Sequence, residues 1–491
     1  MTGQSEHIWD DDALHEECGV FGIFDHADAG ALSVLGLHSL QHRGQEAAGI
    51  VTYDQGQFIA ERHMGLVGDA FGRNSQAARN LRGRFAIGHN RYSTAGGSRA
   101  ANIQPMFADL TGGGLAIAHN GNLTNAHTLR TELVAQGAIF HSTSDTETII
   151  HLTARSSKAR IVDKLIDALC QVQGAYSLVA LTSKKLIGVR DPHGVRPLVM
   201  GNLDGAVIFA SETCALDIIG AEYVRDVKAG EMIVVDKDGV RSHFPFKPQS
   251  HRFCVFEYIY FARPDSTLEG RNVYEARKNI GAVLAHEAPV DADMVIPVPD
   301  SGVPAALGFA EASGLPFELG IIRSHFVGRT FIQPSQHIRE LGVRMKHSPN
   351  RAVIEGKRVV LIDDSIVRGT TSLKIVRMVR EAGAKEVHLR SASPPILWPD
   401  FYGIDMPERD QLLAATKSME DMAAFLEVDS LGFLSVDGLY QALGVGARNA
   451  VQPQFTDHYF TGDYPTRLLD REIAQGRNDQ SDRQLSFLVS A

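Results

Sequence analysis

The sequence has little cysteine, with four residues in a chain of 491. They stand far apart, at Cys18, Cys170, Cys214 and Cys254, and their spacing fits neither a disulfide framework nor a zinc site. Such sparse cysteine favours a reducing cytoplasm. The sequence also lacks any apolar run near the roughly 20 residues that cross a bilayer. We therefore expect a cytoplasmic protein that does not bind a membrane.

Basic residues are not in surplus either, because 48 Lys and Arg stand against 58 Asp and Glu. The formal net charge of −10 argues against nonspecific binding to nucleic acid, which relies on Lys and Arg at the phosphates. It leaves open a local site for a small phosphorylated ligand. The first 17 residues hold six acids, no Lys or Arg and no apolar run, so they do not resemble a secretory signal.

The residues that are present are typical of a globular protein, with 44% apolar and 22% charged. The length indicates two to four domains. From Cys18 to about Pro248, short apolar runs separated by turn signals favour antiparallel strands, with two helical stretches between them. From about His251, strand and helix alternate, which favours a parallel sheet. We therefore expect two halves of different architecture.

The first half carries a set of residues suited to amide hydrolysis. Cys18 would be a nucleophile if the leader were removed, because its free α-amine, with a pKa of about 7.7–8.0, can serve as the base for its thiol. The amide of Asn120 and the backbone N–H of Gly121 can stabilise an oxyanion. Arg91 can hold a carboxylate and Asp145 an ammonium group. Glutamine offers both groups and a side-chain amide.

Taken one at a time, these residues indicate nothing so specific. A free cysteine such as Cys18 is most often a small buried residue. Asn120 followed by Gly121 is most often a hairpin turn. Asp145 before a helix is most often an N-cap, and Arg91 alone would be read as part of a surface ion pair.

Their surroundings narrow the interpretation. The stretches ECGVFGI, QHRGQEAAGI, GHNRYSTAG, AHNGNL and SDTE, in this order, resemble the glutaminase domain of the N-terminal-nucleophile amidotransferases. The resemblance implies that the bond before Cys18 is cleaved autocatalytically and that Cys18 then releases ammonia from glutamine. It implies that Asn120 and Gly121 form the oxyanion hole and that Arg91 and Asp145 bind glutamine.

In the second half, VVLIDDSIVRGTTS (359–372) is typical of a buried strand that ends at Asp363 and Asp364. Neighbouring strand residues point to opposite sides, so the two acids need not share one ligand. One can meet a Mg²⁺-bound ligand, and both can accept hydrogen bonds from ribose hydroxyls. Residues 368–371 then open a helix whose free N–H groups can hold a phosphate. A bare strand–acid–helix pattern is otherwise mostly an N-cap or a solvated turn.

The full run resembles the signature with which phosphoribosyltransferases bind 5-phosphoribosyl-1-diphosphate. Residues 295–308 look like a strand and diphosphate loop, and residues 327–350 look like the catalytic flexible loop, although a basic loop is otherwise usually a solvated face. The resemblance implies Mg²⁺, one per subunit, on Ser301, Asp363 and Asp364. It implies diphosphate and phosphoribosyl binding by Asp300, Ser301, Gly302, Arg329, Arg344, Lys346, Asp363, Asp364, Arg368, Gly369, Thr370 and Thr371.

Both halves together resemble the glutamine phosphoribosyldiphosphate amidotransferases. The resemblance implies an α+β, four-layer αββα glutaminase domain followed by an α/β, parallel-sheet phosphoribosyltransferase domain. The boundaries would be a propeptide at 1–17, the glutaminase at 18–250, the transferase at 251–466 and a polar tail at 467–491. The family makes 5-phosphoribosylamine, glutamate and diphosphate in the first committed step of purine synthesis. It also implies homotetramers and inhibition by purine nucleotides such as AMP and GMP.

One branch of that family holds a [4Fe–4S] cluster on four cysteines. Cys254 matches the first ligand position, but the second position is Asp400 and the last two fall in the stretch at 456–459, which has no cysteine. Three of the four thiolates are therefore absent, and four-thiolate ligation is the norm. We expect no cluster, and Cys254 as a buried apolar residue.

Two other functions remain as alternatives. A regulatory protein could bind phosphoribosyl diphosphate without turnover, but the paired acids, the basic loop and a complete glutaminase argue against it, and no strongly basic segment suggests DNA binding. Amino-sugar and asparagine synthetases share the first half, but their second halves would carry sugar-isomerase or adenylating patterns. The sequence favours the coupled enzyme.

Overall fold

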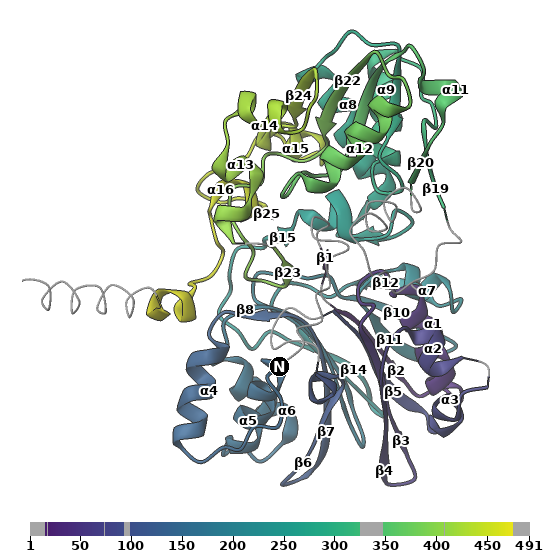
Figure 1. Cartoon of the computed structure of the whole chain (residues 1–491). Coiled ribbons are helices and arrows are strands. Elements are labelled where there is room, and N and C mark those ends of the chain that lie inside the picture. Colours follow the sequence, from purple (N-terminus) through teal and green to yellow (C-terminus); the bar gives the residue numbers. More distant parts are fainter. Residues whose placement is uncertain are drawn as a thin grey trace, which may run out of the picture.

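The computed structural model describes residues 15–16, 18–72, 74–92, 99–324, 347–406 and 408–474. These form two lobes, with the purple, blue and teal segments below and the teal, green and yellow segments mainly above (Figure 1). Most of the predicted leader and tail lies outside the described residues, as does most of the predicted flexible loop. Within the described part of the chain, no helix is long and apolar enough to cross a membrane.

Two antiparallel sheets form the lower lobe. One has seven strands in the order β12-β10-β11-β2-β5-β3-β4 and the other six in the order β14-β13-β9-β8-β7-β6. The seven strands are β2 Gly19–Phe24, β3 Ala47–Asp54, β4 Gln57–Met64, β5 Phe85–Arg91, β10 Val199–Leu203, β11 Ala206–Ala210 and β12 Glu222–Asp226. The six strands are β6 Met106–Leu110, β7 Gly113–Leu123, β8 Gly174–Thr182, β9 Leu186–Arg190, β13 Met232–Asp236 and β14 Gly239–His243.

Helices cover the outer faces of both sheets (Figure 1). The seven-stranded sheet carries α1 Ala29–Ser39, α2 Val67–Phe71, α3 Gln76–Asn80 and α7 Cys214–Asp217. The six-stranded sheet carries α4 Ala126–Ala135, α5 Thr146–Arg155 and α6 Ile161–Leu169. The lobe is therefore layered αββα, which confirms the predicted architecture.

Strand β2 shows why this lobe needs four layers. Its side chains point alternately to opposite faces. Phe21 and Ile23 join the core cluster that includes Leu37 of α1. Val20 joins the cluster between the sheets, together with Val179 of β8. Both faces of β2 are buried, which explains why its sequence is continuously apolar rather than alternating.

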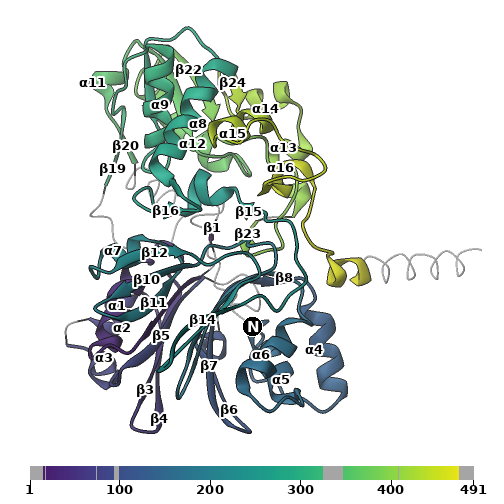
Figure 2. The ribbon, with the colours of Figure 1, turned by 180° about the vertical axis from the view of Figure 1, so that it is seen from behind.

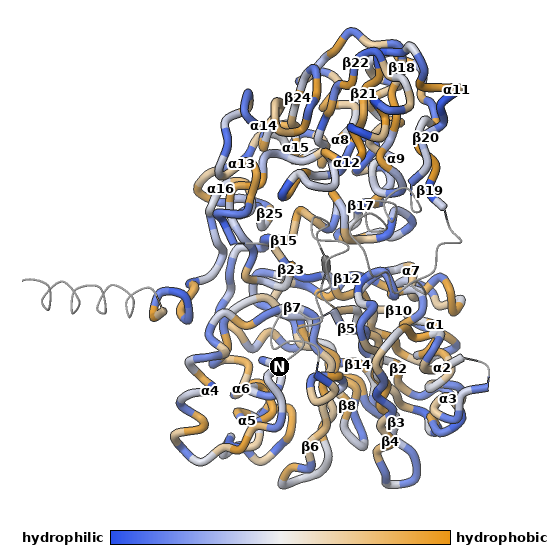
Figure 3. The backbone as a smooth tube through the Cα atoms, in the orientation of Figure 1, coloured by the Kyte–Doolittle hydropathy of each residue, from blue (hydrophilic) through white to orange (hydrophobic). Residues whose placement is uncertain are grey.

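A parallel sheet in the order β18-β21-β22-β24 forms the centre of the upper lobe, again as predicted. Its strands are β18 Met294–Pro297, β21 Arg358–Asp363, β22 Glu386–Ser391 and β24 Ser430–Phe433. The surrounding helices include α8 Val273–Glu287, α9 Val303–Ser313, α12 Thr370–Glu381, α14 Met419–Phe425 and α15 Val436–Ala442. Figure 3 shows hydrophobic stretches on the strands and helices inside each lobe and hydrophilic stretches in the outer loops.

Short elements complete the upper lobe and connect it to the lower one. They are the helices α11 Arg351–Ile354, α13 Leu413–Thr416 and α16 His458–Thr461, and the strand pairs β16 Thr267–Leu268 with β17 Arg271–Asn272 and β19 Ile321–Arg323 with β20 His347–Pro349. Between the lobes, β1 His15–Glu16 pairs with β23 Ile404–Asp405 (Figure 2). Nearby, β15 Phe253–Cys254 pairs with β25 Phe455–Thr456 (Figure 1). A one-turn π-helix, η2 Glu257–Phe261, follows β15.

Candidate active site

Cys18 lies directly before β2, with only 7% of its surface exposed. Its φ angle of 70° is in the left-handed region, so the chain turns sharply into the strand. Its backbone N–H donates to the carbonyl of Arg43 at 3.2 Å, and its Sγ lies 4.0 Å from the carbonyl oxygen of Tyr92. Cys214 and Cys254 belong to an apolar core cluster, but Cys18 belongs to none of the four clusters. Its surroundings therefore differ from those of a core cysteine.

Asn120 and Gly121 lie inside β7 and do not form a hairpin turn. Asn120 is fully buried, and neither Nδ2 nor Oδ1 has a hydrogen-bond partner among the described residues. A buried amide without partners costs free energy, so this side chain is ready for a ligand. At Gly121, φ is 136° and a Cβ would lie 2.1 Å from the carbonyl oxygen of Ala175. Only glycine fits there.

Arg91 is the last residue of β5, and its side chain is buried. The preceding residue, Asn90, pairs with Gly19 of β2, so Arg91 and Cys18 lie at the same end of two neighbouring antiparallel strands. The Arg91 Nη1 donates to the carbonyl of Arg99 at 3.4 Å. Across the interface between the sheets, β7 packs against both β2 and β5. The structure thus places Cys18, Arg91 and the Asn120 strand on neighbouring elements.

Asp145 precedes α5 but does not cap it with its side chain. Its Oδ2 accepts a hydrogen bond from the backbone N–H of Leu123 at 3.0 Å, and its Oδ1 lies 3.6 Å from Nδ1 of His119. Burial alone would raise the pKa of Asp145, but His119 and the hydrogen bonds lower it below its ordinary value. The carboxylate is therefore charged at neutral pH, as an ammonium partner requires.

Two histidines near this site were not singled out from the sequence. His119 contacts Asp145 and Thr146, and its Nε2 has no hydrogen-bond partner among the described residues. The Nε2 of His89 lies 3.0 Å from the carbonyl oxygen of His119. Burial lowers the pKa of His89 to about 3, so its ring is neutral. His89 and His119 stand in the motifs GHNRYSTAG and AHNGNL, directly beside Asn90 and Asn120. That position in the sequence could have indicated that they lie near the site.

The second candidate site lies at the carboxyl ends of β18 and β21, which pair in parallel. Asp363 ends β21, and Asp364 follows it; both are buried. Asp363 accepts hydrogen bonds from the Asp364 N–H at 3.0 Å and from the Ser372 hydroxyl at 3.3 Å. The Asp364 carboxylate accepts from the Ser365 hydroxyl at 2.9 Å. Burial raises the pKa of Asp364, although hydrogen bonds from Ser301 and Ser365 oppose the shift.

The loop after β18 approaches these acids closely. The hydroxyl of Ser301 hydrogen-bonds to the Asp364 carboxylate. A Cβ at Gly302 would lie 2.5 Å from the carbonyl oxygen of Ile362, so this close approach requires glycine. Asp300 forms a half-exposed ion pair with Arg323 at 2.5 Å. The structure therefore brings the predicted diphosphate loop and the acidic strand end together.

The turn at 368–371 leads into α12. Gly369 is its N-cap, with φ at 79°, and no side chain caps the helix there. Arg368 donates to Gln411 at 3.0 Å. The first backbone N–H groups of α12 can therefore receive a phosphate. The predicted loop residues Arg329, Arg344 and Lys346 lie outside the described residues.

The oxygen ligands at this edge suit Mg²⁺ bound together with a substrate. Among the described residues, no group of three His, Cys, Asp or Glu side chains forms a ready-made metal site. Mg²⁺ is commonly held by one or two carboxylates, several waters and substrate phosphates. Asp363, Asp364 and the Ser301 hydroxyl supply such a set, whereas a site built for the metal alone would need more ligands.

The positions compared with iron–sulfur ligands hold a different arrangement. The Nε2 of His458 lies 2.8 Å from Oδ1 of Asp400, and both side chains are fully buried. The Cys254 Sγ lies 3.2 Å from the Tyr459 hydroxyl. Burial raises the pKa of Cys254 to about 12, which disfavours the thiolate that a cluster requires. These residues do not fit a four-thiolate cluster, and its absence stays a prediction for iron and sulfide analysis.

Comparisons with known proteins agree with both halves. The family model of the glutamine amidotransferase domain matches residues 89–217, and that of the phosphoribosyl transferase domain matches residues 272–391. The amidophosphoribosyltransferase of Rhizobium etli is 61% identical over 487 residues, covering 98% of this chain and 97% of that protein. The amidophosphoribosyltransferase of Bacillus subtilis is 49% identical over 461 residues, covering 94% and 96%.

Two solved structures are also similar. One is the glutamine phosphoribosylpyrophosphate amidotransferase of B. subtilis complexed with ADP and GMP, with a TM-score of 0.87 and 47% identity; the match covers 92% of this chain and 98% of that one. The other is described as the allosteric regulatory enzyme of purine biosynthesis, with a TM-score of 0.88 and 48% identity; the match covers 92% and 97%.

Proposed function

The chain belongs to the amidophosphoribosyltransferases, and from this premise we propose how its residues divide the work. The family's enzymes transfer the amide nitrogen of glutamine to 5-phosphoribosyl-1-diphosphate at the start of purine synthesis, giving 5-phosphoribosylamine, glutamate and diphosphate. None of the relatives described above is named as a regulator without turnover. The lower lobe would release ammonia, and the upper lobe would use it.

In the lower lobe, the Cys18 thiol attacks the side-chain carbonyl carbon of glutamine. The α-amine freed by loss of the leader takes the thiol proton and later gives a proton to the departing ammonia. Asn120 Nδ2 and the Gly121 N–H donate to the oxyanion. Arg91 pairs with the substrate carboxylate and Asp145 with its ammonium group. Water then hydrolyses the thioester and releases glutamate.

In the upper lobe, ammonia that has stayed shielded from water displaces diphosphate from the anomeric carbon of the ribose. Asp363 and Asp364 accept from the ribose hydroxyls, the N–H groups of residues 368–371 bind the 5-phosphate, and residues 300–302 bind the diphosphate. Mg²⁺ bound by Ser301, Asp363 and Asp364 would neutralise the leaving diphosphate. Arg329, Arg344 and Lys346 would add positive charge when their loop closes over the substrate.

The remaining assignments complete the proposal. The boundaries are a propeptide at 1–17, the glutaminase at 18–250, the transferase at 251–466 and a tail at 467–491. We assign the protein to the cytoplasm as a homotetramer that purine nucleotides such as AMP and GMP inhibit. The similar B. subtilis enzyme was solved with ADP and GMP, which supports nucleotide control here.

The amide of Asn120 is the observation that best supports the oxyanion role. Both polar atoms of this fully buried side chain are without partners among the described residues. We expect Asn120→Ala to lower the glutamine-driven kcat by about 10²-fold, because one oxyanion donor is lost. The ammonia-driven rate should not change. Steady-state assays with each nitrogen source measure both rates, and a loss confined to the ammonia-driven rate would contradict this role.

Turnover separates the enzyme from a binding protein. With glutamine and phosphoribosyl diphosphate both present, we expect many equivalents of glutamate and diphosphate per chain, in equal amounts. Coupled assays for the two products measure the ratio over time. Tight binding of phosphoribosyl diphosphate with no product beyond one equivalent would instead favour a regulatory role.

A further inference from the structure

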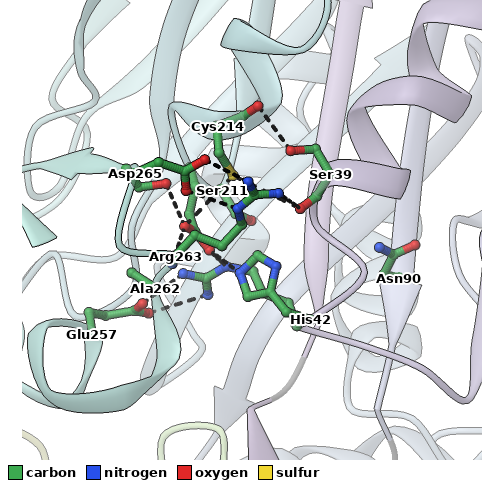
Figure 4. A network of polar contacts seen from close by, with 12 residues as sticks. Ser39, His42, Asn90, Ser211, Cys214, Glu257, Ala262, Arg263 and Asp265 are labelled. Carbon is green, nitrogen blue, oxygen red and sulfur yellow. Dashed lines mark hydrogen bonds and ion pairs between the residues drawn. The ribbon is translucent and has the colours of Figure 1, made fainter. Parts of the chain in front are cut away.

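Three charged side chains with no exposed surface lie where the lower lobe meets the segment that leads to the upper lobe. They are Arg43, Glu212 and Glu257. We call them the Arg43 cluster, and Figure 4 shows Glu257 with the neighbouring His42 and Arg263. None of the three belongs to the two candidate sites. Arg43 stands in the QHRGQE stretch, which the proposed chemistry does not otherwise use.

Glu212 binds groups from both sides of this junction. It accepts from Nε of Arg43 and, at 2.6 Å, from Nε2 of His42, both in the loop after α1. It also accepts from the backbone N–H of Arg263 at 2.9 Å and from the Ser266 hydroxyl at 2.7 Å. Burial would raise the pKa of Glu212, but Arg43 and His42 hold it well below its ordinary value. The carboxylate therefore stays charged.

Glu257 binds the other side of the same guanidinium. Its Oε2 accepts from Nη2 of Arg43 at 2.6 Å and its Oε1 from Nη1 at 3.3 Å, a bidentate pair. Glu257 is the first residue of η2. Arg277 of α8 fixes that turn, donating to the carbonyls of Tyr258 at 2.9 Å and Ala262 at 2.7 Å. Arg43 is thereby attached to the framework of the upper lobe.

The backbone of Arg43 faces the nucleophile. Its carbonyl accepts from the N–H of Cys18 at 3.2 Å. In the mature chain that nitrogen would be the α-amine, which must hold its lone pair toward the thiol. Buried ion pairs contribute little net free energy to folding, because removing charges from water is costly. Their geometry is nevertheless well defined, and here it fixes the carbonyl that faces the amine.

We propose that Arg43 is a positioning residue of the glutaminase, held by Glu212 and Glu257, and that its carbonyl orients the α-amine of Cys18. The inference rests on the proposed role of Cys18. One N–H of the amine donates to the Arg43 carbonyl, and the lone pair is left to take the thiol proton. Because Glu257 comes from η2, the amine is oriented only when the segment joining the lobes is in place.

The test uses Arg43→Lys and Glu257→Gln in the mature full-length protein. Lysine at position 43 keeps the positive charge but loses the guanidinium that binds Glu212 and Glu257 at once. Glutamine at position 257 keeps the size of the side chain but loses its charge. We expect the glutamine-driven kcat to fall about 10- to 100-fold in Arg43→Lys and less in Glu257→Gln, as misplacement of a reacting group commonly costs. The KM for glutamine and the ammonia-driven rate should stay within about twofold of the unmodified protein. The double variant should lose no more than Arg43→Lys alone.

Glu269→Gln is the matched control. Glu269, like Glu257, is a carboxylate paired with a buried arginine, and it follows η2 in the chain. Its partner at 2.5 Å is Arg190 of β9, which is not a member of the Arg43 cluster. Its kcat with glutamine should be unchanged. Three results would each overturn the proposal. They are an unchanged glutamine-driven kcat in Arg43→Lys, an equal fall of the glutamine-driven and ammonia-driven rates in that variant, and the same fall of the glutamine-driven kcat in the control. If Cys18→Ala kept its glutamine-driven activity, the proposed function itself would be wrong.

Discussion

Cys18→Ala should abolish synthesis of phosphoribosylamine from glutamine and leave synthesis from added ammonia intact. The variant loses the only atom that forms the thioester, so the glutamine-driven rate should fall by at least about 10⁴-fold. The ammonia-driven rate depends on the residues around β18, β21 and α12 in the upper lobe, whereas Cys18 lies directly before β2 in the lower lobe. Assays with each nitrogen source at saturating phosphoribosyl diphosphate measure the two rates separately.

Cys170→Ala is the matched control for this variant. Cys170 is exposed, but partial desolvation of its thiol and, to a lesser extent, the nearby Asp167 raise the pKa of that thiol, so it is a poor nucleophile. Both rates should be unchanged in it. Loss of both activities in folded Cys18→Ala, or of neither, would count against the assignment of Cys18.

Asp364→Asn should impair transfer to the ribose and spare glutamine hydrolysis, the reverse of the effect of Cys18→Ala. Removing this charge removes a contact to the ribose and to Mg²⁺, which we expect to cost several kcal/mol of transition-state stabilisation. Transfer should therefore fall on the order of 10³-fold with either nitrogen source. Burial already raises the pKa of Asp364, so a neutral amide of the same shape should be tolerated by the fold. Basal hydrolysis of glutamine should remain.

Asp293→Asn is the control at the other end of the same strands. Asp293 precedes β18 and accepts from the backbone N–H of Arg358 at 2.8 Å, at the start of β21. Transfer should be normal in this variant, because the proposed site lies at the carboxyl ends of the strands and Asp293 lies at their amino ends. Normal transfer by Asp364→Asn, or equal losses in both variants, would contradict the assignment of the acidic strand end.

Much of the architecture could be predicted because it depends on local pattern. The run Val359–Ile362 is continuously apolar, and the structure buries all of it in a central parallel strand. The glutaminase architecture followed from a resemblance carried by several short motifs. The roles of Cys18, Arg91 and Asp145 stay predictions, although the structure places them on neighbouring elements.

Other features could not be read from local pattern, because they depend on contacts between distant residues. Asp145 stands where an N-cap is expected, but its carboxylate instead binds the backbone of Leu123 on β7. The dipeptide Asn120–Gly121 is typical of a hairpin turn, yet both residues lie within a strand. Arg43 and Glu257 are 214 residues apart, and neither residue indicates the other in the sequence. Only the packing within the lower lobe, and of that lobe against the segment containing η2, brings these groups together.

The mass of the purified, active chain tests the central claim most directly, because the proposed base exists only after the leader is lost. We expect intact-mass analysis of the wild-type protein to find a species that begins at Cys18, without residues 1–17. Cys18→Ala, which lacks the thiol for self-cleavage, should retain them. A wild-type protein that retains the leader in full and still turns over glutamine at its full rate would contradict the account, since its Cys18 would have no α-amine.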